Sequence, residues 1–401
     1  MNPLRAHWQL DPEITFLNHG SFGACPTTVS AVQTELRTRI EREPVAFFMR
    51  ECEGLLDAAR AALAAFVGAP ADDIALVRNA TAGVNTVLRS LELGPGDELL
   101  TTDHVYNACR NALHHVADRA GARVVVADVP FPLRDDGAVV DAVLGAVSPH
   151  TVLVLLDHIT SPTGLVLPVD RIVAALRQRG VDSLVDGAHA PGMVELDLTA
   201  LGATYYTGNC HKWLCTPKGS AFLYVHPDRQ PRIRPLSISH GANSPRTDRS
   251  RFRLEFDWAG TDDPTPWLCI PAALEWLGQL FPGGWPELRR HNHELAVAGR
   301  AVLLEALGVA EAPAPESMLG SLAAVPIPAR TDGAGTSPMT IDPLQDWLFH
   351  EHRIEVPVMS WPAAPRRLLR IAAQAYNHLD DYRRLGAALA AVPDSLGGNR
   401  S

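Results

Sequence analysis

The sequence predicts an α/β fold, with a mostly parallel sheet in a large domain and a smaller α+β domain at the C-terminal end. Two observations carry this prediction. Short β-branched runs alternate with helix-like runs from about residue 70 to residue 225, an order typical of a parallel sheet covered by helices on both faces. The chain, at 401 residues, is also longer than one small core requires, so two domains are expected.

The predicted sheet contains six short apolar segments: Ile74–Val77, Glu98–Thr101, Arg123–Ala127, Val152–Leu156, Ser183–Val185 and Ala221–Val225. Between them, apolar residues recur at helical spacing in Ala82–Leu91, Ala108–Ala120 and Pro168–Gln178. Ligands of parallel sheets bind at the carboxyl ends of the strands. Polar residues follow four of these strands, at Asn79–Thr81, Asp103–Tyr106, Ser161 and Asp186. We therefore expect a site at that edge.

Residues 229–266 are rich in proline, arginine and polar residues, which predicts a long loop or an arm that reaches a partner subunit. Beyond it we expect helices and two strand-like pieces: Trp267–Leu280, His291–Leu307 and Leu379–Ala391, then Leu322–Pro326 and Arg353–Val358. The large domain is placed at residues 16–265 and the small one at 266–395. Residues 1–15 are expected to pack on the small domain, and the tail 397–401 to be frayed.

Composition excludes several classes of protein. Hydrophobic residues make up 46% and charged residues 20% of the chain, as in ordinary globular proteins. The net charge of −10 argues against nucleic-acid binding. No secretory pattern or membrane-length apolar run is present, and the six cysteines show no paired spacing, so a cytoplasmic protein with reduced thiols is expected. Cys210, His211 and Cys215 form an incomplete ligand set, and no metal is expected.

A lysine and an aspartate are the strongest candidates for chemistry. Lys212 lies 26 positions after Asp186, which ends an apolar strand. A lysine can form a Schiff base with an aldehyde, and a buried acid can keep a pyridine nitrogen protonated, so the two meet the requirements of pyridoxal phosphate chemistry. Trp213 and Leu214 predict burial of Lys212, which lowers the pKa of an amine. Lys218 is the rival lysine, and Asp186 could instead cap a helix.

Three further positions fit such a ligand. Residues 78–85 lead from a strand into a helix, whose first amides and dipole favour a phosphate, with the Thr81 hydroxyl beside them. Asn79 or Thr81 could equally be a simple helix cap. Arg370 suits bidentate capture of a carboxylate, or a surface salt bridge. His189 could face the ligand or be a structural histidine.

At this point the chain resembles class V aminotransferase-type, fold type I pyridoxal phosphate enzymes, and within them the isopenicillin N epimerase-like branch. The resemblance runs from about Phe16 to Ala391. It rests on eight motifs in the family's order, at residues 17–23 (LNHGSFG), 78–81 (RNAT), 102–108 (TDHVYNA), 161–164 (SPTG), 186–189 (DGAH), 208–213 (GNCHKW), 259–261 (AGT) and 370–377 (RIAAQAYN). These motifs are specific for fold and cofactor, and less specific for reaction.

The resemblance implies a role for each matching residue. Lys212 would bind the cofactor aldehyde and act as base, and Asp186 would pair with the ring nitrogen. Tyr106 would stack on the ring, with His104 as the alternative if the register slips by two. The other implied cofactor contacts are Ala80 (through its backbone), Thr81, Ser161, His189, Asn209, His211 and, from a neighbouring subunit of a homodimer, Thr261. Arg370, Asn18 and His19 would contact the amino-acid substrate.

The sequence departs from cysteine desulfurases of this class. Those enzymes carry a nucleophilic cysteine shortly before the carboxylate-binding arginine, whereas this chain has no cysteine after Cys269. An ordinary desulfurase is therefore not expected. An epimerase or racemase is the main expectation. A carbon–sulfur lyase and an aminotransferase are alternatives, because both share the first proton abstraction with an epimerase. A non-catalytic cofactor-binding protein is the remaining alternative.

Overall fold

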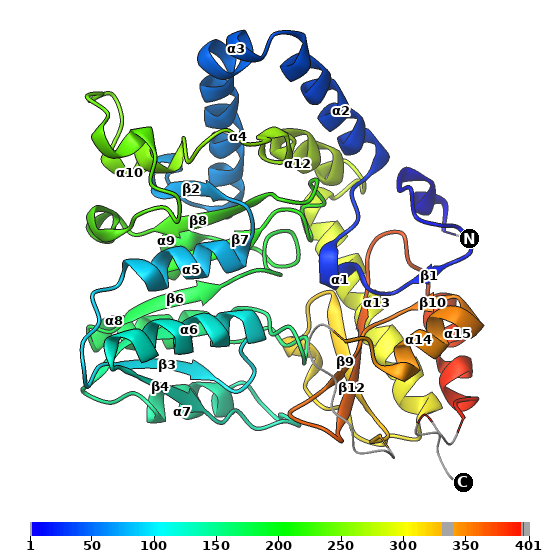
Figure 1. Cartoon of the computed structure of the whole chain (residues 1–401). Coiled ribbons are helices and arrows are strands. Elements are labelled where there is room, and N and C mark those ends of the chain that lie inside the picture. Colours follow the sequence, from blue (N-terminus) through cyan, green and yellow to red (C-terminus); the bar gives the residue numbers. More distant parts are fainter. Residues whose placement is uncertain (1, 331–339, 394–395, 397–401) are drawn as a thin grey trace.

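A seven-stranded sheet forms the centre of the computed structural model, which describes residues 2–330, 340–393 and 396. The strands lie in the order β2-β8-β7-β6-β5-β3-β4 (Figure 1). Their bounds are β2 Ile74–Val77, β3 Glu98–Thr102, β4 Arg123–Ala127, β5 Thr151–Asp157, β6 Asp182–Asp186, β7 Tyr205–Asn209 and β8 Ala221–Val225. Strands β4, β3, β5, β6 and β7 are parallel, whereas β8 is antiparallel to both of its neighbours. The predicted α/β class is confirmed.

Alternate residues of each strand enter different hydrophobic cores, as the two-residue period of a strand requires. In β5, Leu153 and Leu155 pack in the core that contains α5 (Ala80–Ser90) and α6 (Asn107–Ala120). Val154 and Leu156 pack instead in the core on the opposite face, with α7 (Gly137–Gly145) and α8 (Val169–Gln178). Figure 1 shows α5 and α6 crossing the near face of the sheet. Both faces are therefore covered.

The helices at the N-terminal end pack beside the sheet. They include α2 (Thr27–Arg42) and α4 (Cys52–Val67), which contact α11 (Thr265–Leu268) and α12 (Ile270–Gly278). One helix was predicted over Trp267–Leu280, and two short helices occupy this region. The connection at 229–266 contains the 3-10 turns η4 (Pro227–Arg232) and η5 (His240–Asn243) and the helix α10 (Arg251–Phe256).

The C-terminal part is a three-stranded antiparallel sheet with helices. Its strands lie in the order β11 (Val358–Ser360), β12 (Arg367–Ala372) and β9 (Leu322–Ile327). The helices are α13 (Gly284–Ala306), α14 (Pro343–His352) and α15 (Leu379–Ala390). The predicted strand at Arg353–Val358 is split, because β10 (Ile354–Glu355) pairs with β1 (Thr15–Phe16) instead of joining this sheet.

The N-terminal segment lies against the C-terminal part. Thr15 pairs with Ile354, and the Asn2 side chain donates to the carbonyls of Ala375 and Asn377. The division into domains at 16–265 and 266–395 stays a prediction, and residues 394–395 and the tail 397–401 lie outside the described residues. Within the part of the chain that is described, no helix is both long and apolar enough to cross a bilayer.

Candidate active site

Lys212 lies in a loop that β7 and β8 hold closed. The amides of Cys210 and His211 donate to the Ser220 carbonyl at 3.0 and 3.2 Å, which fixes the base of the loop. The Lys212 amine is enclosed, and this loss of hydration, followed by the charge of Arg370, lowers its pKa to about 7. A substantial fraction of this amine is therefore neutral and nucleophilic at neutral pH. Lys218, the rival lysine, is exposed.

The His189 ring lies between Lys212 and Trp213. The Trp213 indole N–H donates to His189 Nδ1 at 3.4 Å, so the imidazole proton belongs on Nε2. His189 Nε2 is 3.2 Å from Lys212 Nζ. Burial and the charge of Lys212 lower the pKa of His189 well below its usual value, so the ring is neutral. This tautomer directs a donor at the lysine nitrogen and favours the uncharged amine.

Asp186 ends β6 on the face of the sheet that α6 covers. Its Oδ2 accepts from the Cys109 thiol at 3.1 Å, and its Oδ1 accepts from the Ala188 amide at 3.0 Å. Burial raises its pKa, while these two hydrogen bonds and the charge of Lys212 act in the opposite direction. A buried carboxylate of this kind is stabilised most by a cationic partner, such as a protonated ring nitrogen.

The N-terminus of α5 forms the end of the site that we expected to bind phosphate. Asn79 caps the helix by accepting from the Ala82 amide at 2.8 Å, and Thr81 is half-buried. The Ala80 amide donates to Asn209 Oδ1 at 2.8 Å. A phosphate contact by the Ala80 amide would therefore require Asn209 to release it. His211 uses Nδ1 toward the Ser220 carbonyl. The phosphate roles of these residues stay predictions.

Arg370 comes from β12 and points toward the large sheet. Its guanidinium donates to the carbonyl and hydroxyl of Ser161, and its Nη2 is 3.4 Å from Ser21 Oγ. The structure thus brings Ser161 to Arg370, and its expected contact with the cofactor stays a prediction. Gly20 lines the same space, since a Cβ atom there would lie 3.5 Å from Arg370 Nη2 and 3.6 Å from His189 Cε1.

Tyr106 and His104 occupy different environments. Tyr106 is 44% exposed, and burial raises its pKa. Its amide donates at 3.3 Å to Oδ1 of Asp157, the residue paired with Asp186 across the neighbouring strands. His104 is fully buried, with Thr163 Oγ1 at 2.9 Å and the Val129 carbonyl at 3.2 Å. The geometry favours Tyr106 for the ring-stacking role, which remains a prediction.

His19 lies beneath the lysine loop. Its Nε2 is 3.0 Å from the Lys212 carbonyl and its Nδ1 is 2.9 Å from the Tyr376 hydroxyl, so both nitrogens have protein partners. The His19 ring therefore supports the lysine backbone, and it does not offer a free nitrogen to the expected substrate. Asn18 accepts from the Ser21 hydroxyl at 2.5 Å and donates to Glu355 at 2.9 Å. Ser21 is thus the link from this segment to Arg370.

Thr261 lies in an exposed stretch between α10 and α11. Arg78, just after β2, anchors this stretch through an ion pair with Asp262 and a hydrogen bond to the Asp263 carbonyl at 3.0 Å. The outward position fits a residue that reaches a neighbouring subunit, and that role stays a prediction.

Two buried residues of this region were missed. Cys109 contacts Asp186 although the two residues are 77 positions apart in the sequence, and no local sequence pattern predicts this contact. Asp157 ends β5 beside Asp186, in register with it. The run Leu155-Leu156-Asp157 matches Leu184-Val185-Asp186, so the rule that selected Asp186 could also have selected Asp157.

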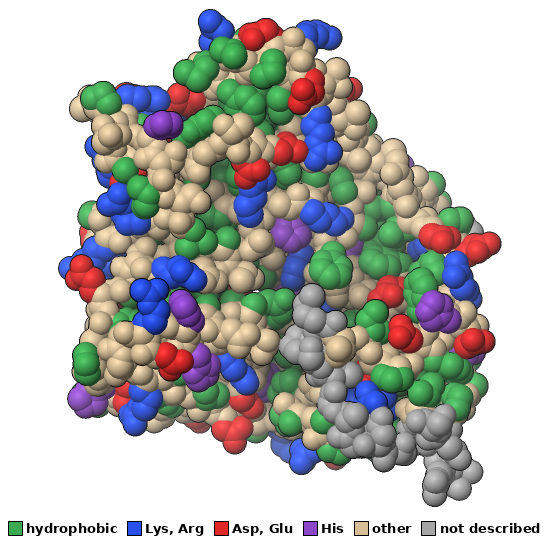
Figure 2. All heavy atoms as spheres, viewed as in Figure 1, with side chains coloured by type: hydrophobic (Ala, Val, Ile, Leu, Met, Phe, Trp, Pro, Cys, Tyr) green, Lys and Arg blue, Asp and Glu red, His purple; other side chains and the backbone are tan. Residues whose placement is uncertain are grey.

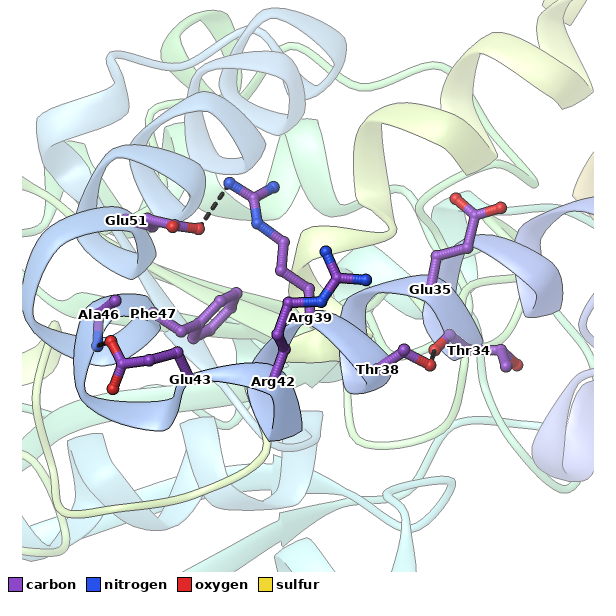
Figure 3. Close-up of a pocket in the computed structure, with 9 residues that line it drawn as sticks. All are labelled: Thr34, Glu35, Thr38, Arg39, Arg42, Glu43, Ala46, Phe47 and Glu51. Carbon is purple, nitrogen blue, oxygen red and sulfur yellow. Dashed lines mark hydrogen bonds and ion pairs between the residues drawn. The ribbon is translucent and has the colours of Figure 1, made fainter.

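Figure 2 shows Lys or Arg and His side chains together in the middle of the face between the large sheet and the C-terminal part. A separate surface hollow of about 470 Å³ lies among α2, α3 (Pro44–Ala46) and η2 (Phe47–Glu51) (Figure 3). An ion pair between Arg39 and Glu51 at 2.5 Å crosses it. The hollow shares no residue with the site around Lys212.

Comparisons with known proteins give the family of the chain. The aminotransferase class-V family matches residues 22–329. The chain is 36% identical to an isopenicillin N epimerase of Amycolatopsis lactamdurans, over 96% of each protein. It is 29% identical to a probable L-cysteine desulfhydrase, chloroplastic, of Arabidopsis thaliana, over 94% of this chain and 83% of the relative.

The fold is similar to that of C-DES, solved as a mutant with glycine covalently linked to its PLP cofactor. The TM-score is 0.78 at 23% identity, over 96% of this chain and 98% of the other. This likeness concerns the fold. The family match covers more than half of the chain, and the epimerase relative is matched over nearly its whole length. The chain belongs to the aminotransferase class-V family.

Proposed function

We propose that this protein is a pyridoxal phosphate enzyme that acts at the α-carbon of an amino acid, as an epimerase or racemase. The observation that carries the proposal is the Lys212 amine, whose pKa is lowered to about 7 in a buried neighbourhood that includes Asp186, His189 and Arg370. An amine that is neutral at working pH can both bind an aldehyde and accept a proton from carbon.

The residues present fit the cofactor. Asp186 supplies a buried acid for the ring nitrogen. The N-terminus of α5, with Thr81, would bind a phosphate once Asn209 releases the Ala80 amide. His189 presents its Nε2–H next to the lysine nitrogen, where a phenolic oxygen would accept it. When bound, pyridoxal phosphate supplies an electron sink for charge released at the α-carbon.

The chain's own groups perform the remaining tasks. Arg370 binds the substrate carboxylate, and its contact with Ser161 holds the guanidinium in place. Lys212 takes the α-proton, and the Asp186 carboxylate would keep the ring nitrogen of a bound cofactor protonated. Return of a proton from the opposite face inverts the carbon. Tyr106 is our candidate for that face, with His104 and water as alternatives.

A carbon–sulfur lyase is the second candidate function, and the cysteine desulfhydrase relative favours it. Loss of a β-substituent after the same proton abstraction would make a lyase, and return of the proton to the cofactor would make an aminotransferase. Ordinary desulfurase activity does not fit, because the segment before Arg370 (residues 355–361) carries no thiol to form a persulfide.

We also infer a cytoplasmic homodimer in which Thr261 of one subunit reaches the phosphate of the other. Neither nucleic acid nor membrane is proposed as a partner, given the net charge of −10. A non-catalytic cofactor-binding protein is the remaining alternative, and measurable turnover would exclude it.

The test is incubation of the purified protein with single amino acids and cysteine conjugates in heavy water. An epimerase gives deuterium at the α-carbon together with inverted chirality. A lyase releases a thiol or sulfide, and an aminotransferase gives a keto acid. If no amino acid in the panel exchanges its α-hydrogen, the proposal is wrong.

Asp186→Ala provides the matched variant. It should retain part of the cofactor but lose most α-hydrogen exchange, because the ring nitrogen no longer keeps its proton. Undiminished exchange in this variant would contradict the role of Asp186.

A further inference from the structure

Asp157 is a second buried acid beside Asp186. The two residues are directly paired in the register of the parallel strands β5 and β6, and each is 3% exposed. Neighbouring parallel strands lie about 4.8 Å apart. Asp157 also shares its strand parity with Leu153 and Leu155, and Asp186 shares its parity with Leu184, all of which face α6. Both carboxyl groups therefore lie on the same face of the sheet.

The two acids differ in how the protein satisfies them. Asp186 accepts hydrogen bonds on both oxygens, from Cys109 and Ala188. Asp157 accepts on Oδ1 alone, from the Tyr106 amide at 3.3 Å, and its buried Oδ2 has no partner among the described residues. Burial of an anion with an unpaired oxygen is far more costly than burial of a neutral acid.

The charged groups around Asp157 do not compensate for this burial. Asp186 on β6 would repel a second anion, and the Cys109 thiol on α6 stays protonated because burial and then the charge of Asp186 raise its pKa. Arg110 attracts Asp157, but its Nη2 already donates to the Asp103 carbonyl at 2.8 Å. Lys212 has a lowered pKa and so carries only part of its charge. Two adjacent carboxylates of this kind do not both ionise.

We propose that Asp157 is a positioning residue that stays protonated, so that the acid pair carries a single negative charge and this charge resides on Asp186. The inference rests on the proposed function and deepens it, because it explains how one anion is kept available for a cationic ring nitrogen. Burial, and then the charge of Asp186, raise the pKa of Asp157 well above its usual value, in agreement with this placement.

The same residue links two parts of the site. Asp157 Oδ1 accepts from the amide of Tyr106, the N-cap residue of α6, and Cys109 on α6 donates to Asp186. Through the N-terminal end of α6, the neutral Asp157 therefore positions both Tyr106 and Asp186.

The test compares purified full-length wild type with Asp157→Asn, which replaces a neutral acid by a neutral amide of the same shape. At neutral pH, the infrared spectrum of wild type should contain the carbonyl band of a protonated carboxyl group, shifted by heavy water. Asp157→Asn should lose this band. Asp141→Asn, which removes an exposed acid of α7, is the matched control and should keep it.

Unfolding in urea across pH gives a second readout. An acid whose pKa is raised on folding stabilises the protein at low pH, and this stabilisation is lost as pH rises from the unfolded pKa to the folded one. Within that window, the ratio of the folding equilibrium constant of Asp157→Asn to that of wild type should increase about tenfold for each unit that the pH rises. The ratio of Asp141→Asn to wild type should stay flat.

An infrared band that survives in Asp157→Asn, or a flat stability ratio, would overturn the proposal. If Asp157→Asn does not fold, Asp157→Thr provides the same comparison with a smaller acceptor for the Tyr106 amide. Both readouts require neither turnover nor a substrate. Failure of the proposed function would appear separately, as absent α-hydrogen exchange in wild type.

Discussion

Two groups of partly or fully buried charged side chains differ in how completely opposite charges are paired within them. In the arginine cluster, defined here as Arg60, Arg249 and Arg253, each guanidinium contacts Asp57 and Asp257. Burial alone would raise the pKa of Asp57, but the hydrogen bond and charge of Arg249 hold it below its usual value. Around Lys212 the shifts are opposite, with raised acids and a lowered amine.

This difference separates a structural group of charges from a functional one. The ion pairs between these acids and arginines anchor α10 to α4. Groups whose charged forms are disfavoured can change protonation state readily, or can bind a charged ligand from outside the protein. Several perturbed groups converge at the carboxyl ends of β5, β6 and β7, and this convergence marks the site more clearly than any surface hollow does.

The largest effect is expected at the unbalanced group. Lys212→Ala should abolish the borohydride-reducible cofactor adduct and lower turnover by at least about 10²–10⁴-fold, the range for loss of a positioned general base. Absorbance and mass spectrometry of the reduced protein measure this. Lys218→Ala, at the exposed rival lysine, should keep the adduct. A full adduct in Lys212→Ala would refute the assignment.

Much of the fold could be predicted from the sequence because apolar periodicity reports burial. The strands β2, β4 and β8 have the predicted bounds. β7 was missed because Thr207, Gly208 and Asn209 interrupt an apolar run, although every residue of the strand is buried. The bounds of β12 were not predicted, because two buried arginines, Arg367 and Arg370, lie within it. Polar residues in buried strands have tertiary partners that no local pattern reveals.

The candidate site was predictable in part. Motifs at strand ends selected Lys212, Asp186, His189 and Arg370, which the structure brings to one region. Partners from distant segments were not predictable, since the contacts of His19 with Lys212 and Tyr376 depend on how the N-terminal segment folds back. The tautomer of His189 likewise depends on the Trp213 indole, which sequence analysis used only as a sign of burial.

The second largest effect is expected in the balanced cluster. Asp257→Asn removes a negatively charged partner of the fully buried Arg60. Loss of one partner of a buried ion pair lowers the free energy of unfolding by about 3 kcal/mol. Urea denaturation should show this loss, while the reducible adduct at Lys212 persists. Asp248→Asn, at an exposed ion pair with Arg246, should change the free energy of unfolding little. Loss of the adduct in Asp257→Asn would contradict the separation of the two groups.

The smallest effect is a shift in pH dependence. The rate at which cofactor-free protein captures pyridoxal phosphate should rise with pH through about 7, because the neutral amine of Lys212 reacts. In Arg370→Gln a positive neighbour is lost, so the pKa of Lys212 rises and the curve moves to higher pH. Stopped-flow absorbance measures both curves. A shift toward lower pH would show that Arg370 does not act on the lysine.

The hydrogen bonds of the N-terminal segment carry a consequence for synthesis of the protein. Thr15 pairs with Ile354, the Ala372 amide donates to the Leu17 carbonyl, and His19 joins Tyr376 to the Lys212 carbonyl. Residues 15–19 leave the ribosome early, but they can form all of these hydrogen bonds only after residue 376 has emerged. Nascent chains that stop short of this point retain the lysine but lack the support beneath it, so ribosome-bound intermediates should acquire the cofactor late.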